Sequence, residues 1–224
     1  MLTEPNPPRI QRRCLQVAPL LGLFMACACV YSDSRLRIAY KPSMSVLTTS
    51  SRPVYLARVG DQRKDPSRIG CKRGSFGGES AKLYMEEPVT VWFKQALSRE
   101  LGRSGLSLAS ADYPGIVRIE VDLLDLFIEP DKTLFSNYLV VAQINAEVMV
   151  QFQNGASFAR RFVSLAEDSA LVATDGDYEG VMQQALERWM VQAVGDIVNL
   201  IESQVSATSA SGPVSWALVT KDRP

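Results

Sequence analysis

The residues of this sequence with the greatest capacity for chemistry are its four cysteines, three of which lie within the first 30 positions. Cys27 and Cys29 stand one residue apart at the end of an apolar run, a spacing that suits either metal-binding thiolates or a thiol that carries a lipid. A zinc site needs about four cysteine or histidine ligands. The chain has no histidine and no second pair of closely spaced cysteines. We therefore predict no metal and no cofactor, and we interpret the pair as a site of lipid attachment.

The segment before these cysteines, residues 1–26, is predicted to be a signal peptide. Its front carries three arginines, and the run Cys14–Ala26 is apolar but interrupted by a proline and a glycine. A charged front, an apolar stretch of about 7–15 residues and small residues at the cleavage point are typical of a secretory signal. A membrane-spanning helix needs about 20 apolar residues. A retained anchor helix is the alternative.

The sequence FMAC, Phe24–Cys27, resembles the lipobox of bacterial lipoproteins, in which a small residue precedes the acylated cysteine. Ala26–Cys29, ACAC, offers a second register. One acyl chain gives only marginal membrane binding, whereas two or three chains anchor a protein stably. We predict lipidation of Cys27, with Cys29 as the alternative. The protein is then expected in the outer membrane, with residues 27–51 as a flexible tether and a domain that faces the periplasm.

That domain is predicted over residues 52–205, and residues 206–224 are predicted to be a mobile tail. Apolar residues make up 46% of the chain, which is enough for a real core. Alternation and helical spacing of apolar residues define the elements. They predict strands over 53–59, 116–128, 138–152 and 157–165, helices over 88–102 and 178–205, and a further candidate strand at 35–40.

These elements predict an α+β fold, in which two amphipathic helices pack on one face of an antiparallel or mixed sheet of about four strands. Asn154-Gly155, between two alternating runs, is the strongest short signal for a hairpin. The strand over 53–59 reaches the other strands only through a helix, so it is the candidate for parallel pairing. Residues 129–133 are predicted to be a turn.

The stretch Asp61–Glu87 is rich in glycine and charge and is predicted to be a long loop with room for a hairpin. Its centre, IGCKRGSFGGES, lacks the GxxxxGK[ST] pattern of phosphate-binding loops. We interpret it as an exposed glycine-rich turn. Lys72, Arg73 and Phe76 are its candidate partner-contact residues, because exposed loops often carry function. Cys71 is expected to be either free or bonded to the cysteine of the N-terminal pair that carries no lipid.

The lack of histidine removes the commonest general base and every Ser-His or Cys-His nucleophile pair. Glu120 and Asp122 are candidates for a glycosidase-like carboxylate pair, but alternation puts both on the wet face of a strand. We predict no catalytic residues and no enzymatic activity, with a carboxylate hydrolase as the alternative. Basic and acidic residues number 24 each. No basic patch stands out, so no nucleic acid is expected as a partner.

Three sequence elements resemble those of a known family. They are VGDQR at Val59–Arg63, IG and FGGE within Ile69–Glu79, and a helix of the type VxxWFxxALxxEL…G over Val89–Gly105. With the lipobox-like signal before them, they resemble the YajG-type lipoproteins of Gram-negative bacteria. More loosely, the chain is similar to the auxiliary lipoproteins of envelope ABC transport systems. The resemblance implies an envelope lipoprotein without established enzymatic activity, and it supplies no catalytic residues.

The function expected from the sequence is therefore that of a non-catalytic, membrane-anchored lipoprotein. Its partners would be the membrane, reached through the lipid, and an unidentified envelope protein or a lipid-related molecule. The alternative is a periplasmic auxiliary subunit of an ABC-type transport or secretion machine.

Overall fold

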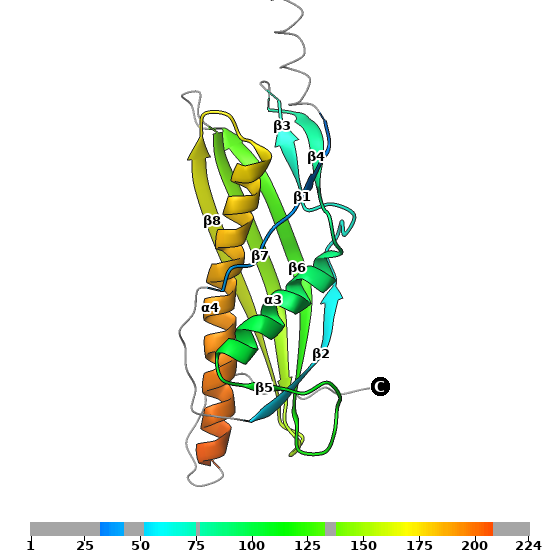
Figure 1. The fold of residues 1–224 in the computed structure, drawn as a ribbon, viewed down its shortest axis with the longest axis vertical. Helices are drawn as coiled ribbons and strands as arrows, with labels where there is room; N and C mark the ends of the chain where they lie inside the picture. Colours follow the sequence, from blue (N-terminus) through cyan, green and yellow to red (C-terminus); the bar gives the residue numbers. More distant parts are fainter. Residues whose placement is uncertain (1–31, 43–51, 75–76, 133–137, 208–224) are drawn as a thin grey trace, which may run out of the picture.

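Two helices and a mixed sheet make up the part of the chain that the computed structural model describes, which is residues 32–42, 52–74, 77–132 and 138–207 (Figure 1). The helices are α3 (Val89–Arg103) and α4 (Asp175–Ala207). The strands are β1 (Ser34–Leu36), β2 (Pro53–Asp61), β3 (Gly70–Arg73), β4 (Glu79–Met85), β5 (Ser107–Leu108), β6 (Val117–Lys132), β7 (Tyr138–Gln151) and β8 (Ser157–Ala170). The prediction of an α+β fold with two helices and a mixed sheet is confirmed.

The predicted strand count is wrong, because the sheet has eight strands within the described residues. The additional strands are β1, which overlaps the candidate strand at 35–40, together with β3, β4 and β5. The longest of them has seven residues and the shortest has two. Such short strands are set by pairing with their neighbours rather than by a long alternating pattern. The predicted long loop over Asp61–Glu87 contains two of them, β3 and β4, as an antiparallel hairpin.

The three longest strands, β6, β7 and β8, form an antiparallel meander. Asn154 and Gly155 turn the chain between β7 and β8 as predicted, and Gly155 adopts a φ of 83°, which favours glycine. The turn predicted over 129–133 is wrong, because β6 stays paired with β7 up to Lys132, opposite Tyr138. The continuous ladder to a long neighbouring strand overrides the local turn signal.

β2 and β3 both pair with the edge of β6 that faces away from β7, one after the other along the strand. β2 pairs with Val117–Leu123 and β3 reaches Ile128, both in parallel. The parallel pairing of β2 is as predicted, because the chain crosses over through β3, β4 and α3 before it reaches β6. Gly70 of β3 lies so close to β6 that a Cβ atom there would stand 1.9 Å from the carbonyl oxygen of Ile128. β1 extends the sheet by pairing in parallel with β4.

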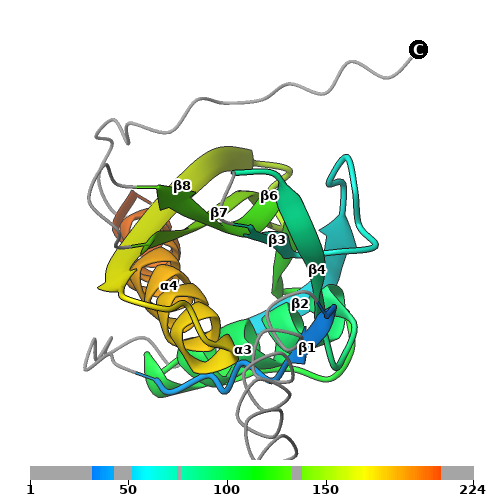
Figure 2. The same cartoon turned by 90° about the horizontal axis from the view of Figure 1, so that it is seen from above.

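The sheet is strongly curved, and seen from above it forms part of a ring that α3 and α4 complete (Figure 2). A register shift in β2 and another in β6 add local twist to the sheet. α3 packs against β2 and β5, and α4 packs against β7 and β8. The two helices meet where the buried rings of Phe93 and Trp189 lie edge to face, 4.8 Å apart.

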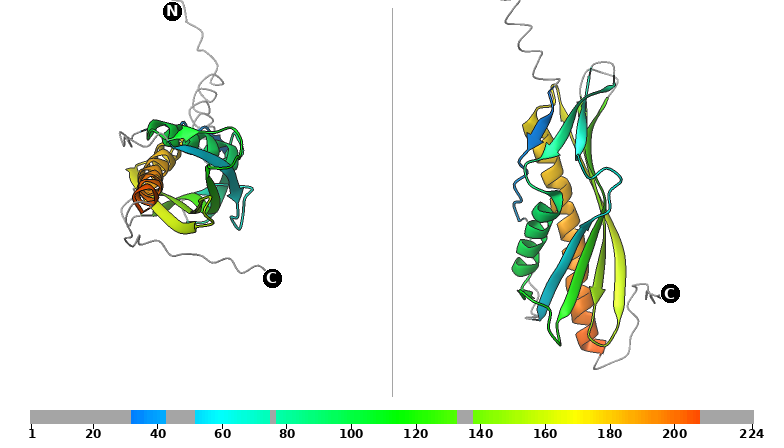
Figure 3. Two further views of the ribbon diagram at one scale, coloured as in Figure 1. Left: turned by 90° about the horizontal axis from the view of Figure 1, so that it is seen from below. Right: turned by 90° about the vertical axis from the view of Figure 1, so that its right-hand side faces the viewer.

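α4 has 33 residues and is therefore about 50 Å long, so its two ends mark opposite ends of the domain (Figure 3, right). It begins before the predicted position because the Asp177 side chain caps its first turn by bonding back to Thr174. The Asp177 carboxylate accepts hydrogen bonds from the N–H and from the hydroxyl of Thr174, each at 2.7 Å. None of the helices in the described ranges combines the length and the apolar character that crossing a membrane requires.

Residues 32–42 belong to the folded domain, although they lie inside the tether predicted over 27–51. Leu36, Ile38 and Tyr40 alternate into the core and are at most 9% exposed. β1 covers the beginning of the candidate strand at 35–40, and the remaining residues of that candidate pack into the core without pairing as a strand. The rest of the predicted tether, the predicted signal peptide and nearly all of the predicted tail lie outside the described residues.

Candidate functional site

The long domain presents two different ends (Figures 1 and 3). The upper end comprises the start of β1, the β3–β4 turn and the turn between β8 and α4. The lower end comprises β5, the loop over 109–116 and the turn between β7 and β8. Lys72 and Arg73, two of the residues predicted as a contact surface, lie at the upper end, and an open pocket lies at the lower end.

The side chain of Lys72 in β3 connects β1 to α4 at the upper end. This side chain is only 10% exposed. The ammonium group donates to Ser34 Oγ at 2.7 Å and pairs with Asp175 Oδ1 at 2.8 Å. The first residue of β1 and the first residue of α4 are thus joined through one buried charge. Because a buried ammonium must be paired and hydrogen-bonded, this contact fixes where the chain enters the fold.

The predicted contact residues have different surroundings. Lys72 is buried, so the exposure predicted for it is wrong. Arg73 donates to the carboxylate of Glu129 and, at 3.1 Å, to the carbonyl oxygen of Gly77. The Glu129 carboxylate raises the pKa of Arg73. Phe76 lies outside the described residues, as do the predicted lipidation sites Cys27 and Cys29.

Two apolar side chains stand out from the upper end in the β8–α4 turn. Leu171 is 77% exposed and Val172 is 64% exposed. The other exposed large hydrophobic side chains of the described residues are between 40% and 50% exposed. The sequence analysis missed this pair, whose signal is an isolated Leu-Val in a turn of small and acidic residues.

The segment after β1, residues 37–42, is held against both helices, and we call it the N-terminal strap. Burial, together with the hydrogen bond to Glu100, raises the pKa of Tyr40. Glu100 is 1% exposed, and its Oε1 atom has no hydrogen-bond partner within the described part of the chain. Hydrogen bonds to both helices hold the strap. They include Trp92 Nε1 to the carbonyl oxygen of Ile38 at 2.9 Å, the N–H of Arg37 to Glu179 Oε1 at 2.8 Å, and Tyr40 OH to Glu100 Oε2 at 2.5 Å.

The carboxylates considered for catalysis, Glu120 and Asp122 of β6, are both in ion pairs. Arg58 of β2 holds Asp122 through two contacts of 2.8 Å. Arg118 pairs with Glu120 and with Asp112, each at 2.8 Å. These pairs connect β2, β6 and the loop before β6. A carboxylate that a guanidinium group already holds is poorly placed to exchange a proton with a ligand.

Cys71 is 3% exposed and unpaired, which is the first of its two predicted alternatives. Burial raises the pKa of its thiol, which keeps the sulfur protonated and unreactive. Within the described ranges, no group of Cys, Asp and Glu side chains is arranged to hold a metal ion.

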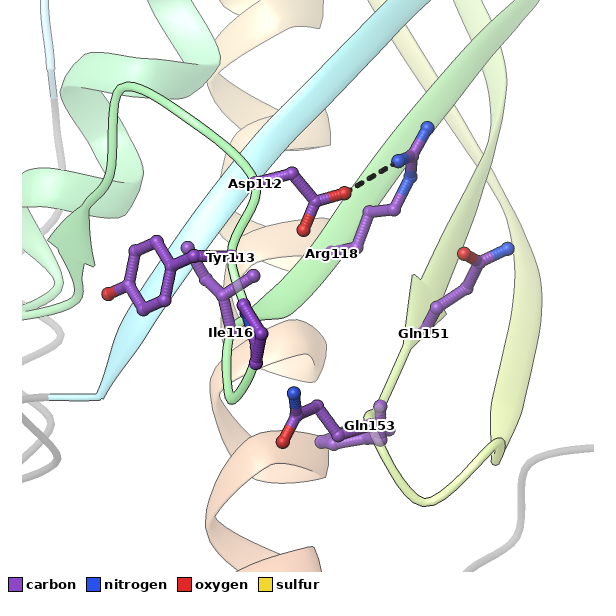
Figure 4. Close-up of a pocket in the computed structure, with 8 residues that line it drawn as sticks. Asp112, Tyr113, Ile116, Arg118, Gln151 and Gln153 are labelled. Atoms are coloured by element: carbon purple, nitrogen blue, oxygen red, sulfur yellow. Dashed lines mark hydrogen bonds and ion pairs between the residues drawn. The ribbon is translucent and has the colours of Figure 1, made fainter.

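An open pocket of about 430 Å³ lies at the lower end (Figure 4). Asp112 and Arg118 face each other on one side of it, and the amides of Gln151 and Gln153 come from the end of β7 and the following turn. Tyr113 is 47% exposed, and its ring projects to the other side of the loop from Arg118. Amides both donate and accept hydrogen bonds, and the ring offers an apolar contact. The pocket therefore suits binding through neutral groups rather than acid–base chemistry. The sequence analysis missed it; the signal was an aromatic residue inside the turn sequence DYPG.

The fold and these features define an elongated α+β domain whose chain enters at one end and whose pocket lies at the other. A family model described as "uncharacterized lipoprotein" matches residues 42–200, and the chain belongs to this lipoprotein family. The prediction of a bacterial lipoprotein is thereby confirmed. Membership indicates a membrane-anchored protein of the cell envelope. A search of curated proteins gives no match.

Solved structures with a similar fold include protein XCC0632 from Xanthomonas campestris. It is 16% identical with a TM-score of 0.52, over 78% of this chain and 98% of that chain, and the likeness shows a shared fold alone. A minor lipoprotein from Acinetobacter baumannii is 11% identical with a TM-score of 0.37, over 73% and 98%. The rare lipoprotein B from Shewanella oneidensis is 10% identical with a TM-score of 0.36, over 67% and 98%.

Proposed function

We propose that the protein is an outer-membrane lipoprotein, acylated at Cys27 or alternatively at Cys29, whose periplasmic domain binds an envelope protein without catalysing a reaction. The observation that carries the proposal is the separation of the chain's entry point from the open pocket. The two lie at opposite ends of a domain about 50 Å long. A lipid at the upper end leaves the lower end free to meet a partner.

The membrane side of the proposal rests on a short connection. Ser32 follows Cys27 by five residues and Cys29 by three. Even a fully extended chain covers no more than about 3.6 Å per residue. Ser34 is tied to α4 through Lys72, so the chain is held at this point. A lipid on either cysteine would keep the upper end of the domain beside the bilayer.

The partner side rests on the chemistry of the lower end. Tyr113 and Leu108 are 47% and 40% exposed, and the amides of the pocket stand close by. Protein interfaces favour tyrosine, because its ring supplies contact area at a low entropy cost and its hydroxyl supplies a hydrogen bond. A segment of an envelope protein that offers backbone groups to the glutamine amides fits this surface.

The absence of catalysis is part of the proposal. An active site needs an acid, base or nucleophile that can reach a ligand. The chain has no histidine, the thiol of Cys71 is buried, and arginines hold Glu120 and Asp122. Binding is the role that remains well supported.

The resemblance to YajG-type lipoproteins supports this assignment. The looser likeness to auxiliary lipoproteins of ABC transport systems supports the alternative, an auxiliary subunit of an ABC-type transport or secretion machine. The two proposals differ in the partner at the lower end. The alternative requires an inner-membrane permease or a secretin.

The lipid anchor can be tested on the mature protein. Cells treated with globomycin should accumulate the unprocessed precursor, and mass spectrometry of the mature N-terminus should find an acylated cysteine at position 27 or 29. An unacylated mature product that starts elsewhere would contradict the anchor.

The partner can be tested with a photo-crosslinking amino acid at Tyr113. The matched control is the same substitution at Val91 of α3, which is 43% exposed. We expect one dominant envelope-protein adduct from position 113 and none from position 91. A permease or secretin in that adduct would favour the alternative. Equal adducts from both positions, or none from either, would contradict a binding site at the lower end.

A further inference from the structure

We infer that the β8–α4 turn inserts Leu171 and Val172 into the surface of the lipid bilayer, so that the domain contacts the membrane at a second point beside its anchor. The inference rests on the proposed lipid at Cys27 or Cys29. It concerns how the upper end is oriented once the lipid is in place.

The position of the turn is set by the contacts of Lys72. Its ammonium joins Ser34, where the chain enters the fold, to Asp175, where α4 begins. Leu171 and Val172 precede Asp175 by only a few residues. The chain between Cys27 and Ser32 spans at most about 18 Å, and the chain from Cys29 spans at most about 11 Å. The bilayer surface is therefore within reach of the end of the domain that presents these two side chains.

The exposure of the pair points to an apolar environment. At 77% and 64%, Leu171 and Val172 are the most exposed large hydrophobic side chains in the described ranges. Water contact with such side chains is unfavourable, and burial in hydrocarbon removes that cost. Aliphatic side chains, which offer no hydrogen bonds, match the interior of a lipid layer better than the polar rim of a protein interface.

The turn is short and held at both ends. β8 is paired with β7 up to Ala170, and the hydrogen bonds from Thr174 to Asp177 hold the start of α4. Only Leu171, Val172 and Ala173 lie between these two fixed points. A preorganised contact loses little conformational entropy on binding.

The charges around the turn define the kind of lipid surface. Glu167, Asp168, Asp175 and Asp177 flank the apolar pair, and no lysine or arginine lies between residues 162 and 187. Lys72 is buried and already paired with Asp175. Acidic flanks repel anionic headgroups, so the contact favours a zwitterionic surface such as phosphatidylethanolamine and owes little to electrostatic attraction.

The experiment uses the full-length acylated protein in vesicles of phosphatidylethanolamine and phosphatidylcholine with brominated acyl chains, which quench tryptophan inside the bilayer. Leu171→Trp reports on the turn, and Leu108→Trp at the lower end is the matched control. The signal of the parent protein, which contains three tryptophans, is subtracted. Val172→Trp replaces the first variant if Leu171→Trp fails to fold, as judged by circular dichroism.

We expect brominated lipid to remove most of the fluorescence added at position 171 and to leave that at position 108 unchanged. The quenching should weaken in vesicles enriched in phosphatidylglycerol. If the protein is acylated and floats with the vesicles while neither position 171 nor 172 is quenched, the inference is wrong and the proposed anchor stands. A protein without an acyl chain overturns both. Quenching that needs phosphatidylglycerol and vanishes in high salt would also contradict apolar insertion.

Discussion

The two ends of the domain use their charged side chains in different ways. At the upper end, the ammonium of Lys72 is buried and joins two elements that are far apart in the sequence. At the lower end, the pair of Asp112 and Arg118 is 48% and 39% exposed and belongs to a surface loop. Breaking a buried ion pair leaves a charged group without a partner and without water, which costs stability. Breaking an exposed ion pair changes stability little. A buried charge thus fixes the chain at the upper end, whereas an exposed ion pair holds the loop at the lower end only weakly.

The exposed apolar side chains differ between the ends as well. The upper end presents the aliphatic pair Leu171 and Val172, and the lower end presents Tyr113 beside amide groups. An aliphatic pair matches lipid, and an aromatic ring with amides matches a protein segment. The two ends thus differ in the chemistry that each offers to a contact, aliphatic at the upper end and aromatic with amides at the lower end.

The largest expected effect comes from Gly70, where β3 pairs with β6. Gly70→Ala would place a Cβ atom 1.9 Å from a backbone oxygen that cannot move without disturbing the sheet. We expect it to lower the free energy of unfolding by more than about 3 kcal/mol, measured by urea titration. The control is Gly78→Ala in the same hairpin, where no atom lies within 4 Å of the added carbon. A similar loss of unfolding free energy in both variants would contradict a stabilising role for the close approach of β3 to β6.

The long periodic elements of this fold could be predicted from the sequence, and the short ones could not. Apolar spacing located both helices and the meander of β6, β7 and β8, because each element follows one period over many residues. β3 and β5 have four and two residues, and their pairing depends on neighbours distant in the chain. The same dependence explains why β6 runs through the predicted turn over 129–133.

The candidate site was harder to predict, because burial decides the role of a charged residue. Lys72 and Arg73 were expected on an exposed turn, but pairing in β3 places Lys72 inside the fold against Ser34 and Asp175. No local pattern connects residues so far apart in the sequence. The exposure of Leu171 likewise depends on where β8 ends and α4 begins.

A smaller loss is expected from Lys72→Met, which keeps the aliphatic stem and removes the charge. Ser34 and Asp175 would lose their shared partner, at a cost of about 2 kcal/mol, because Asp175 remains half exposed to water. The start of β1 should then open more often. Trypsin should cut after Arg35 and Arg37 faster than in the parent protein.

The control for this prediction is Lys82→Met on the neighbouring strand β4. Lys82 is exposed, and its side chain makes no hydrogen bond or ion pair in the described structure. Its substitution should change neither stability nor the rate of cleavage. Equal cleavage in both variants would contradict the role of Lys72 at the upper end.

The N-terminal strap gives a prediction that depends on pH. The pKa of Tyr40 is raised in the folded protein, mainly by burial. Unfolded tyrosine ionises near pH 10, so unfolding releases a proton above that pH. Tyr40 should leave stability unchanged below about pH 10 and contribute a loss of about 1.4 kcal/mol per pH unit above it, because its folded pKa lies still higher.

Tyr40→Phe should make this slope shallower by the same amount, measured by urea titration at a series of pH values. Tyr178 is also buried with a raised pKa, so it should keep contributing its own slope in that variant. At neutral pH, the variant should lose about 1–3 kcal/mol, because the buried carboxylate of Glu100 loses its donor. An unchanged slope above pH 10 would mean that Tyr40 is exposed and the strap is open.

The smallest effect is expected at the lower end, from Asp112→Asn. The variant removes the ion pair with Arg118 but leaves Arg118 paired with Glu120. Exposed pairs contribute about 0–1 kcal/mol and are screened by salt, so the loss in urea titrations should be small and should disappear in high salt. Photo-crosslinking from position 113 reports whether the loop still meets its partner. A loss as large as that of Lys72→Met, and insensitive to salt, would mean that the loop is locked into the fold, and the contrast between a fixed upper end and an open lower end would fail.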